Sequence, residues 1–145
     1  MELKILNKLY IMKYFTLKEL TRSVTAKNKG IDNTPGEVEK NNLIALVENV
    51  LDPLREAWGQ PIIITSGYRC PALNRAVGGS ATSQHVTGEA ADIRTVSDTV
   101  EDNKALYELI KILNLPIDQC INEYGYDWIH VSYSPRNRRK FFSIG

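Results

Sequence analysis

The sequence predicts a single α+β domain in which the helices come first and pack on a small, largely antiparallel sheet. Capped amphipathic segments fill the early part of the chain, and short β-branched runs fill much of the later part. Helices followed by strands, without strict alternation, are typical of α+β folds. A length of 145 residues holds one sizeable core but not two ordinary ones, so residues 1–145 are interpreted as one domain.

The chain begins its regular structure with a short helix. Thr16 and Glu19 form the reciprocal capping pattern of a helix start, and we expect a helix over residues 17–22. Residues 23–33 are polar and contain a glycine, so they are interpreted as a loop.

A longer helix is expected next. Thr34 is suited to cap it and Pro35 to occupy its first turn. Apolar residues then recur at helical spacing as far as Trp58. Pro53 lies inside this pattern and is expected to kink or divide the helix, because proline offers no backbone N–H.

The middle of the chain alternates short strands and helices. Residues 62–65 are a β-branched run that suits a buried strand. Residues 71–77 are expected as a short helix ended by two glycines. Residues 89–93 follow as a short strand, and residues 100–113 have the apolar stripe of an amphipathic helix.

The last predicted elements form a hairpin. Residues 119–123 and 128–133 are interpreted as strands that are joined by a turn over residues 124–127. The tail, residues 136–145, contains four basic residues and is interpreted as a solvated edge.

Composition excludes several classes of protein. A net charge of +1 gives no general attraction to nucleic acid, and no apolar run is long enough to span a bilayer. Lys4 and Lys8 interrupt the apolar core that a signal peptide needs, so we expect synthesis in the cytoplasm, and action outside only after release. Cys70 and Cys120 have no partner at ligand spacing and are expected to be free thiols. We expect a monomer.

The chain has only two histidines, and both lie where a metal site needs them. His85 precedes Asp92 by seven residues, and His130 lies within a predicted strand. If residues 88–92 are extended, Asp92 shares its face with small residues and points into a space that His85 also reaches. Either histidine alone is more often a structural residue, so the argument depends on the three together.

Two imidazoles and one carboxylate leave one position open on a zinc ion, which is the arrangement of catalytic zinc. We therefore expect one Zn²⁺ per chain, held by His85, Asp92 and His130. Such an ion activates water and polarises a peptide carbonyl, but a base must still accept the proton. Asp127 is the preferred base because it lies near the ligand strand, and Glu123 is the alternative.

Several segments together resemble the zinc D-alanyl-D-alanine carboxypeptidase and dipeptidase family, which shares its fold with the hedgehog signalling domain and includes phage endolysins. The resemblance begins near Lys13 and ends near Tyr133, so residues 1–11 are interpreted as an extension. It is carried by four segments, FTLKEL (15–20), ITSGYR (64–69), SQHVTGEAAD (83–92) and DWIH (127–130).

The resemblance implies roles for further residues. By position, His85, Asp92 and His130 would bind zinc, and Asp127 would be the base, although the family often has glutamate there. Arg69 would bind the substrate carboxylate or the developing oxyanion. Among the other candidates, Tyr68 and Trp128 would line the cleft or pack in the core, and the residues suited to contact substrate are Ser83 and Gln84.

The predicted function is hydrolysis of peptide bonds in peptidoglycan stem peptides. A carboxypeptidase that cuts D-Ala-D-Ala and an endolysin-like endopeptidase both fit the sequence. The alternative is a non-catalytic zinc module that binds cell wall or another protein. Loss of both candidate carboxylates would indicate that alternative, but Asp127 and Glu123 are both acidic.

Overall fold

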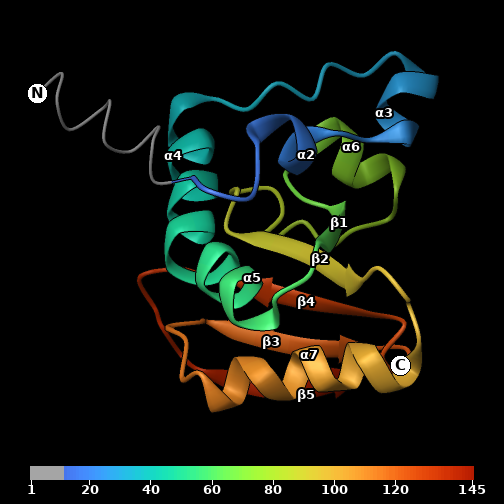
Figure 1. Ribbon diagram of the computed structural model, residues 1–145. Helices are drawn as coiled ribbons and strands as arrows, with labels where there is room; N and C mark the ends of the chain where they lie inside the picture. Colours follow the sequence, from blue (N-terminus) through green and yellow to red (C-terminus); the bar gives the residue numbers. More distant parts are fainter. Residues whose placement is uncertain (1–11) are drawn as a thin grey trace, which may run out of the picture.

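The fold is a five-stranded mixed sheet with helices packed on it, as a computed structural model of residues 12–145 shows (Figure 1). The prediction of a single-domain α+β fold with a largely antiparallel sheet is confirmed, while the interpretation of residues 1–11 as an extension lies outside the described residues. The strand order is β1-β2-β4-β3-β5, and every pairing is antiparallel except β3 with β5. The strands are β1 (Ile62–Ser66), β2 (Ala90–Thr95), β3 (Gln119–Glu123), β4 (Trp128–Ser132) and β5 (Lys140–Ile144).

The helices fall into two groups around this sheet. The first group precedes β1 in the chain. The second consists of α6 (Pro71–Ala76), which follows β1, and α7 (Val100–Ile112), which follows β2. Across residues 12–145, none of the helices is long and apolar enough to cross a membrane. The helices are α2 (Leu17–Thr21), α3 (Val24–Lys29), α4 (Glu37–Leu46), the π-helix η1 (Val47–Leu51), α5 (Asp52–Trp58), α6 (Pro71–Ala76) and α7 (Val100–Ile112).

The predicted loop over residues 23–33 is wrong in its first half, which forms α3. The Ser23 hydroxyl accepts a hydrogen bond from the backbone N–H of Ala26 and so caps the helix. Gly30 ends it in the left-handed conformation, with φ of 64°. The helix was missed because the segment is short and polar and has no apolar stripe.

The predicted start of the next helix is also wrong, by two residues. Gly36, and not Thr34, is the N-terminal cap of α4. The Thr34 hydroxyl instead donates a hydrogen bond of 2.6 Å to the carboxylate of Asp32, within a local turn. Serine, threonine and aspartate side chains serve turns and caps equally well, so the sequence alone did not separate the two uses.

The long helix is divided near Pro53, as predicted, but the division precedes the proline. The α-helical pattern widens into the π-helix η1 before it resumes in α5, where Pro53 lies in the first turn. Proline has no N–H to donate to the carbonyl four residues earlier, and a π-turn is one way in which a helix accommodates a missing bond.

The two faces of the sheet have different surroundings. On one face, the side chains of Ile93, Ile129 and Val131 are fully buried in the main hydrophobic cluster. Helix α7 packs against β2, β3 and β4, and it lies in front of the sheet with α5 in Figure 1. Because side chains alternate along a strand, Asp92 and His130 project from the opposite face.

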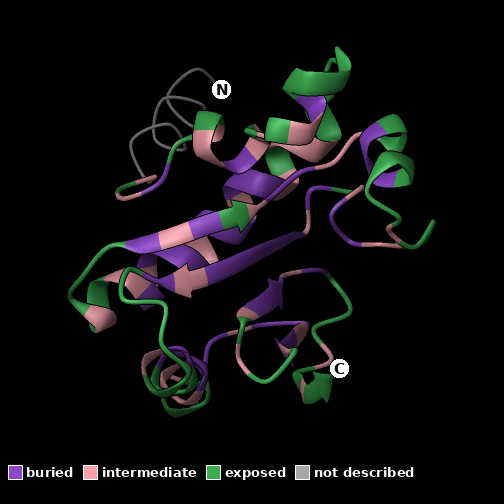
Figure 2. Ribbon diagram, turned by 90° about the vertical axis from the view of Figure 1, so that its right-hand side faces the viewer, coloured by how far each residue is buried: buried purple, intermediate pink, exposed green. Residues whose placement is uncertain are grey.

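The interior strands form a rigid base for that opposite face. In β2 and β4 nearly every residue is buried (Figure 2). Both strands are paired on both edges, so their backbone hydrogen bonds are satisfied within the sheet. Functional side chains that project from such strands are held in place better than side chains on loops.

Both cysteines are free thiols in the structure, as the sequence predicts. Cys120 lies on the core side of β3, and burial raises the pKa of its thiol. Cys70 caps helix α6 by accepting a hydrogen bond from the backbone N–H of Leu73.

Candidate metal centre

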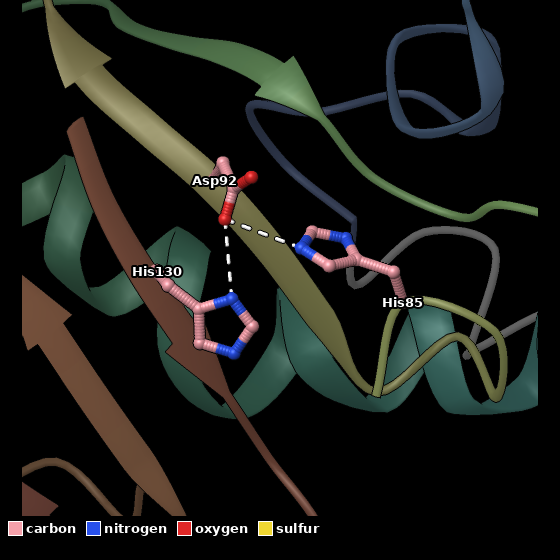
Figure 3. Close-up of side chains that lie close together, drawn as sticks. All are labelled: His85, Asp92 and His130. Atoms are coloured by element: carbon pink, nitrogen blue, oxygen red, sulfur yellow. Dashed lines mark hydrogen bonds and ion pairs between the residues drawn. The ribbon is translucent and has the colours of Figure 1, made fainter. Parts of the chain in front are cut away.

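His85, Asp92 and His130 meet on the open face of the sheet (Figure 3). Asp92 of β2 and His130 of β4 are direct register partners, and His85 reaches them from the loop between α6 and β2. The Asp92 Oδ1 atom lies 3.2 Å from His85 Nε2 and 3.1 Å from His130 Nδ1. All three residues are buried, with 3% to 9% of each exposed. The predicted cluster is therefore present.

A backbone carbonyl fixes the orientation of His85. His85 Nδ1 lies 2.7 Å from the carbonyl oxygen of Gly67, which can only accept, so Nδ1 carries the hydrogen and donates it. In the neutral ring the lone pair is then on Nε2, which faces the Asp92 carboxylate. Two lone pairs at this distance repel each other unless a cation lies between them, either a metal ion or a proton carried by Nε2.

A zinc ion fits this donor set. Imidazole nitrogen and carboxylate oxygen are common zinc ligands, and their bonds of about 2.0 Å place the donors of a tetrahedral site roughly 3.3 Å apart. The three donor atoms here all lie within 4.8 Å of one another, and two of the separations are close to that value. The hydrogen bond from His85 to Gly67 is the outer support that ligand histidines usually have.

The Asp92 carboxyl is held in its charged form. Burial by itself would raise its pKa, but hydrogen bonds and charge interactions with His130 and His85 outweigh burial and place the pKa well below its ordinary value. Its second oxygen, Oδ2, lies 3.8 Å from the Arg69 guanidinium. A carboxylate that stays ionised is the form that a metal ion requires.

The carbonyl that holds His85 depends on a glycine. A Cβ atom at position 67 would clash with the backbone carbonyl of Leu20. We expect Gly67→Ala to shift this segment, to lower stability by about 1–3 kcal/mol, and to weaken zinc binding roughly 10-fold because His85 loses its support. Thermal unfolding and competitive zinc titration measure the two effects.

The matched control for that prediction is Gly30→Ala. A Cβ atom there would meet nothing within 4 Å, although φ is 64°. The control should cost about 1–2 kcal/mol of stability through backbone strain alone and leave zinc affinity unchanged. Equal zinc affinity in Gly67→Ala and the wild type would refute the role given to the Gly67 carbonyl.

The metal centre opens into a cavity of about 500 Å³ on the exposed face of the sheet. Strand β3 supplies part of its wall through the alternate residues Gln119, Ile121 and Glu123. Asp92 and His130 line the same cavity, so substrate that enters it reaches the metal ligands.

Most of the residues predicted to contact substrate line this cavity. Arg69 is oriented by hydrogen bonds to Ser66 and Asn74, and its guanidinium lies beside Asp92. The others that line the cavity are Ser83, Gln84 and Trp128. Tyr68 does not: it is 5% exposed and packs in the hydrophobic cluster.

The two candidate bases are placed differently. Glu123 is half-buried, lines the cavity, and accepts a hydrogen bond of 3.0 Å from the Trp128 indole. Asp127 is exposed in the turn between β3 and β4 and is not among the residues that line the cavity. The structure therefore brings Glu123, and not Asp127, into the same space as the metal ligands.

Sequence reasoning missed the part of the wall that follows β4. Arg136 and Arg138 line the cavity from the turn before β5, as does Ile144 from β5 itself. Their only sequence signal was a cluster of basic residues, which is also typical of a solvated edge.

A buried carboxylate, Asp118, supports this missed segment. Asp118 is fully buried and accepts hydrogen bonds of 2.9 Å from the backbone N–H, Nε and NH2 of Arg138. It also accepts a bond of 2.8 Å from the side chain of Gln84, which lines the cavity too. Asp118 therefore joins two segments of the cavity wall.

The Arg138 guanidinium holds the pKa of the Asp118 carboxyl well below its ordinary value. Stability from this group is thus present above the unfolded-state pKa, near 4, and is lost as pH falls below it. We expect acidification from pH 5 to pH 3 to cost the wild type about 1 kcal/mol more than Asp118→Asn, in which the group cannot titrate. Urea unfolding at both pH values measures the difference, and equal losses would contradict the prediction.

Comparison with known proteins supports the motif-based prediction. Residues 13–132, which are most of the chain, match the family described as peptidase M15. No curated protein gave a match. The resemblance to zinc D-alanyl-D-alanine carboxypeptidases is confirmed by this match together with the His-Asp-His cluster. The chain therefore belongs to the peptidase M15 family.

Proposed function

We propose that the protein is a zinc-dependent peptidase that hydrolyses a bond in peptidoglycan stem peptides. The observation that carries the proposal is one cavity that is lined by the cluster of His85, Asp92 and His130 and also by Glu123, a carboxylate outside that cluster. A purely structural zinc site is closed by its ligands, whereas these three donors lie at the wall of an open cavity. The membership in a peptidase family agrees with this chemistry.

The three ligands would hold zinc, which, when bound, supplies a Lewis acid that activates water and polarises a carbonyl. The Glu123 carboxylate is proposed to accept the proton of the attacking water and to return it to the leaving amine. Its bond from the Trp128 indole holds one carboxylate oxygen in place. Asp127, which the motif favours, remains the competing prediction for this role.

Arg69 is proposed to bind negative charge on the substrate. Its Nε and NH1 atoms are committed to Ser66 and Asn74, so the guanidinium is fixed in direction before substrate arrives. A planar guanidinium suits either a terminal carboxylate or a developing oxyanion. Binding of a terminal carboxylate fits a carboxypeptidase, whereas binding of a developing oxyanion fits a carboxypeptidase or an endopeptidase.

Digestion of defined muropeptides by the zinc-loaded protein, followed by mass spectrometry, tests the proposal. We expect one peptide bond to be cut, with no cleavage after chelation and recovery after zinc is restored. Substrates with a free or an amidated C-terminus separate the two activities, because a carboxypeptidase requires the free carboxylate. Zinc-loaded protein that binds muropeptides without cutting any would instead indicate a non-catalytic module.

A further inference from the structure

The wall of the cavity that is contributed by residues 133–145 lies outside the family match, which ends at residue 132. Arg136, Arg138 and Ile144 nevertheless line the same cavity as the metal ligands. Strand β5 joins the sheet edge by parallel pairing with β3, and this pairing fixes the segment beside the cavity.

The turn before β5 is tied down at several points. Asp118 binds the backbone and guanidinium of Arg138, and its carbonyl accepts a bond of 3.0 Å from the backbone N–H of Lys140. The Ser134 hydroxyl accepts a bond from the backbone N–H of Arg136. A loop fixed in this way presents its side chains at defined positions, as a binding site requires.

The two arginines of this wall, Arg136 and Arg138, differ in whether a carboxylate neutralises their charge. The Nε and NH2 groups of Arg138 face the Asp118 carboxylate, so its positive charge is neutralised. Arg136 is exposed, and within residues 12–145 no carboxylate forms an ion pair with its side chain. Arg136 therefore brings an uncompensated positive charge to the cavity.

The sheet register shows where the arginine turn before β5 is attached relative to the metal ligands. Ile121 is the partner of His130, and Asp118 precedes it by three residues, which is roughly 10 Å along an extended strand. Glu123 lies two residues in the other direction. The arginine turn is tied to Asp118, so it is attached to the sheet about 10 Å along the chain from the partner of His130, on the side away from Glu123.

We propose that Arg136 is a substrate-binding residue that recognises a free carboxylate on the stem peptide. The inference rests on the proposed function and deepens it, because it makes the preferred substrate an acidic stem peptide and not its amidated counterpart. Arg138 and Asp118 are positioning residues that hold the turn, and Arg136 makes the contact. A planar guanidinium with no competing partner suits a carboxylate by a bidentate pair of hydrogen bonds.

The test compares two stem pentapeptides that differ only in whether the carboxylate of the γ-linked glutamate is free or amidated. Values of kcat/KM are measured for the zinc-loaded wild type, Arg136→Gln and Arg139→Gln. Arg139 is the matched control: it lies in the same segment and loses the same charge, but it binds Asn114 and does not line the cavity.

We expect the wild type and Arg139→Gln to prefer the free carboxylate at least about 10-fold, which corresponds to one charge-assisted contact. In Arg136→Gln the preference should fall to nearly one, mainly through a higher KM for the acidic peptide. Equal preference in Arg136→Gln and the wild type, or no preference in the wild type, would overturn the inference and leave the proposed function intact.

Failure of the proposed function gives a different result. If the wild type cuts neither peptide, calorimetric titration of both peptides into the same proteins decides the inference separately. Tighter binding of the acidic peptide that Arg136→Gln alone abolishes would still support the subsite. Equal binding of the two peptides by the wild type would overturn it.

Discussion

Replacement of His85, Asp92 or His130 by alanine is expected to abolish zinc binding and peptidase activity together. Each variant removes one of three donors from a buried cluster in which Asp92 contacts both histidines. Loss of an outer support of a metal site typically costs 10- to 100-fold in affinity, so loss of a ligand should cost more than about 100-fold. Zinc content and muropeptide turnover are measured on the same preparations.

The control for the ligand variants is Glu89→Ala. It removes a carboxylate just before β2 that does not line the cavity. This variant should keep one zinc per chain and near wild-type turnover. Full zinc occupancy in any two of the alanine variants would refute the proposed ligand set.

The second large effect is expected for the catalytic base. Glu123→Gln should keep zinc and lower turnover by at least about 10²-fold, within the range that general-base catalysis supplies. Asp127→Asn, an equivalent change four residues away in the exposed turn, should stay within about threefold of the wild type. Zinc content, kcat and KM are measured for both variants under the same conditions.

The comparison of these two variants decides whether the base is Glu123, which the cavity geometry favours, or Asp127, which the sequence motif favours. Turnover close to that of the wild type in Glu123→Gln, with Asp127→Asn inactive but metal-loaded, would assign the base to Asp127. In that case the turn between β3 and β4 must change conformation when substrate binds. If both variants are active, neither carboxylate is the base.

The metal cluster could be predicted from the sequence for a simple physical reason. The chain has only two histidines, and the period of two along each strand turns Asp92 and His130 away from the core that their apolar neighbours face. The pairing of β2 with β4 then supplies the direct register contact between them. The sequence pattern predicted both strands but not which strands would be neighbours.

The distinction between Glu123 and Asp127 could not be predicted in this way. It depends on the turn that joins their strands, in which Tyr124 and Tyr126 have φ of 50° and 66°. Non-glycine residues seldom adopt this left-handed conformation, and the side chains of the two tyrosines give no sequence signal that predicts it. The turn leaves Asp127 in solvent while Glu123 stays on the cavity side of β3.

Strand β5 was missed because its pattern carries little local information. Its side chains are mostly exposed, and the segment begins next to basic residues that also suit a solvated edge. Parallel pairing with β3 depends on a contact between segments about twenty residues apart. The spacing of apolar residues in a segment indicates which of its side chains are buried. An edge strand that buries few side chains therefore has a weak pattern.

The end of the chain lies at the rim of the cavity. Ile144 lines the cavity, and its carbonyl accepts a hydrogen bond from the backbone N–H of Tyr124 in the turn beside Glu123. Any residues joined after Gly145 would therefore leave the domain next to the entrance that substrate must use. An affinity tag fused there would compete with substrate for space, so enzymatic work on this protein calls for a tag at the other end or for its removal.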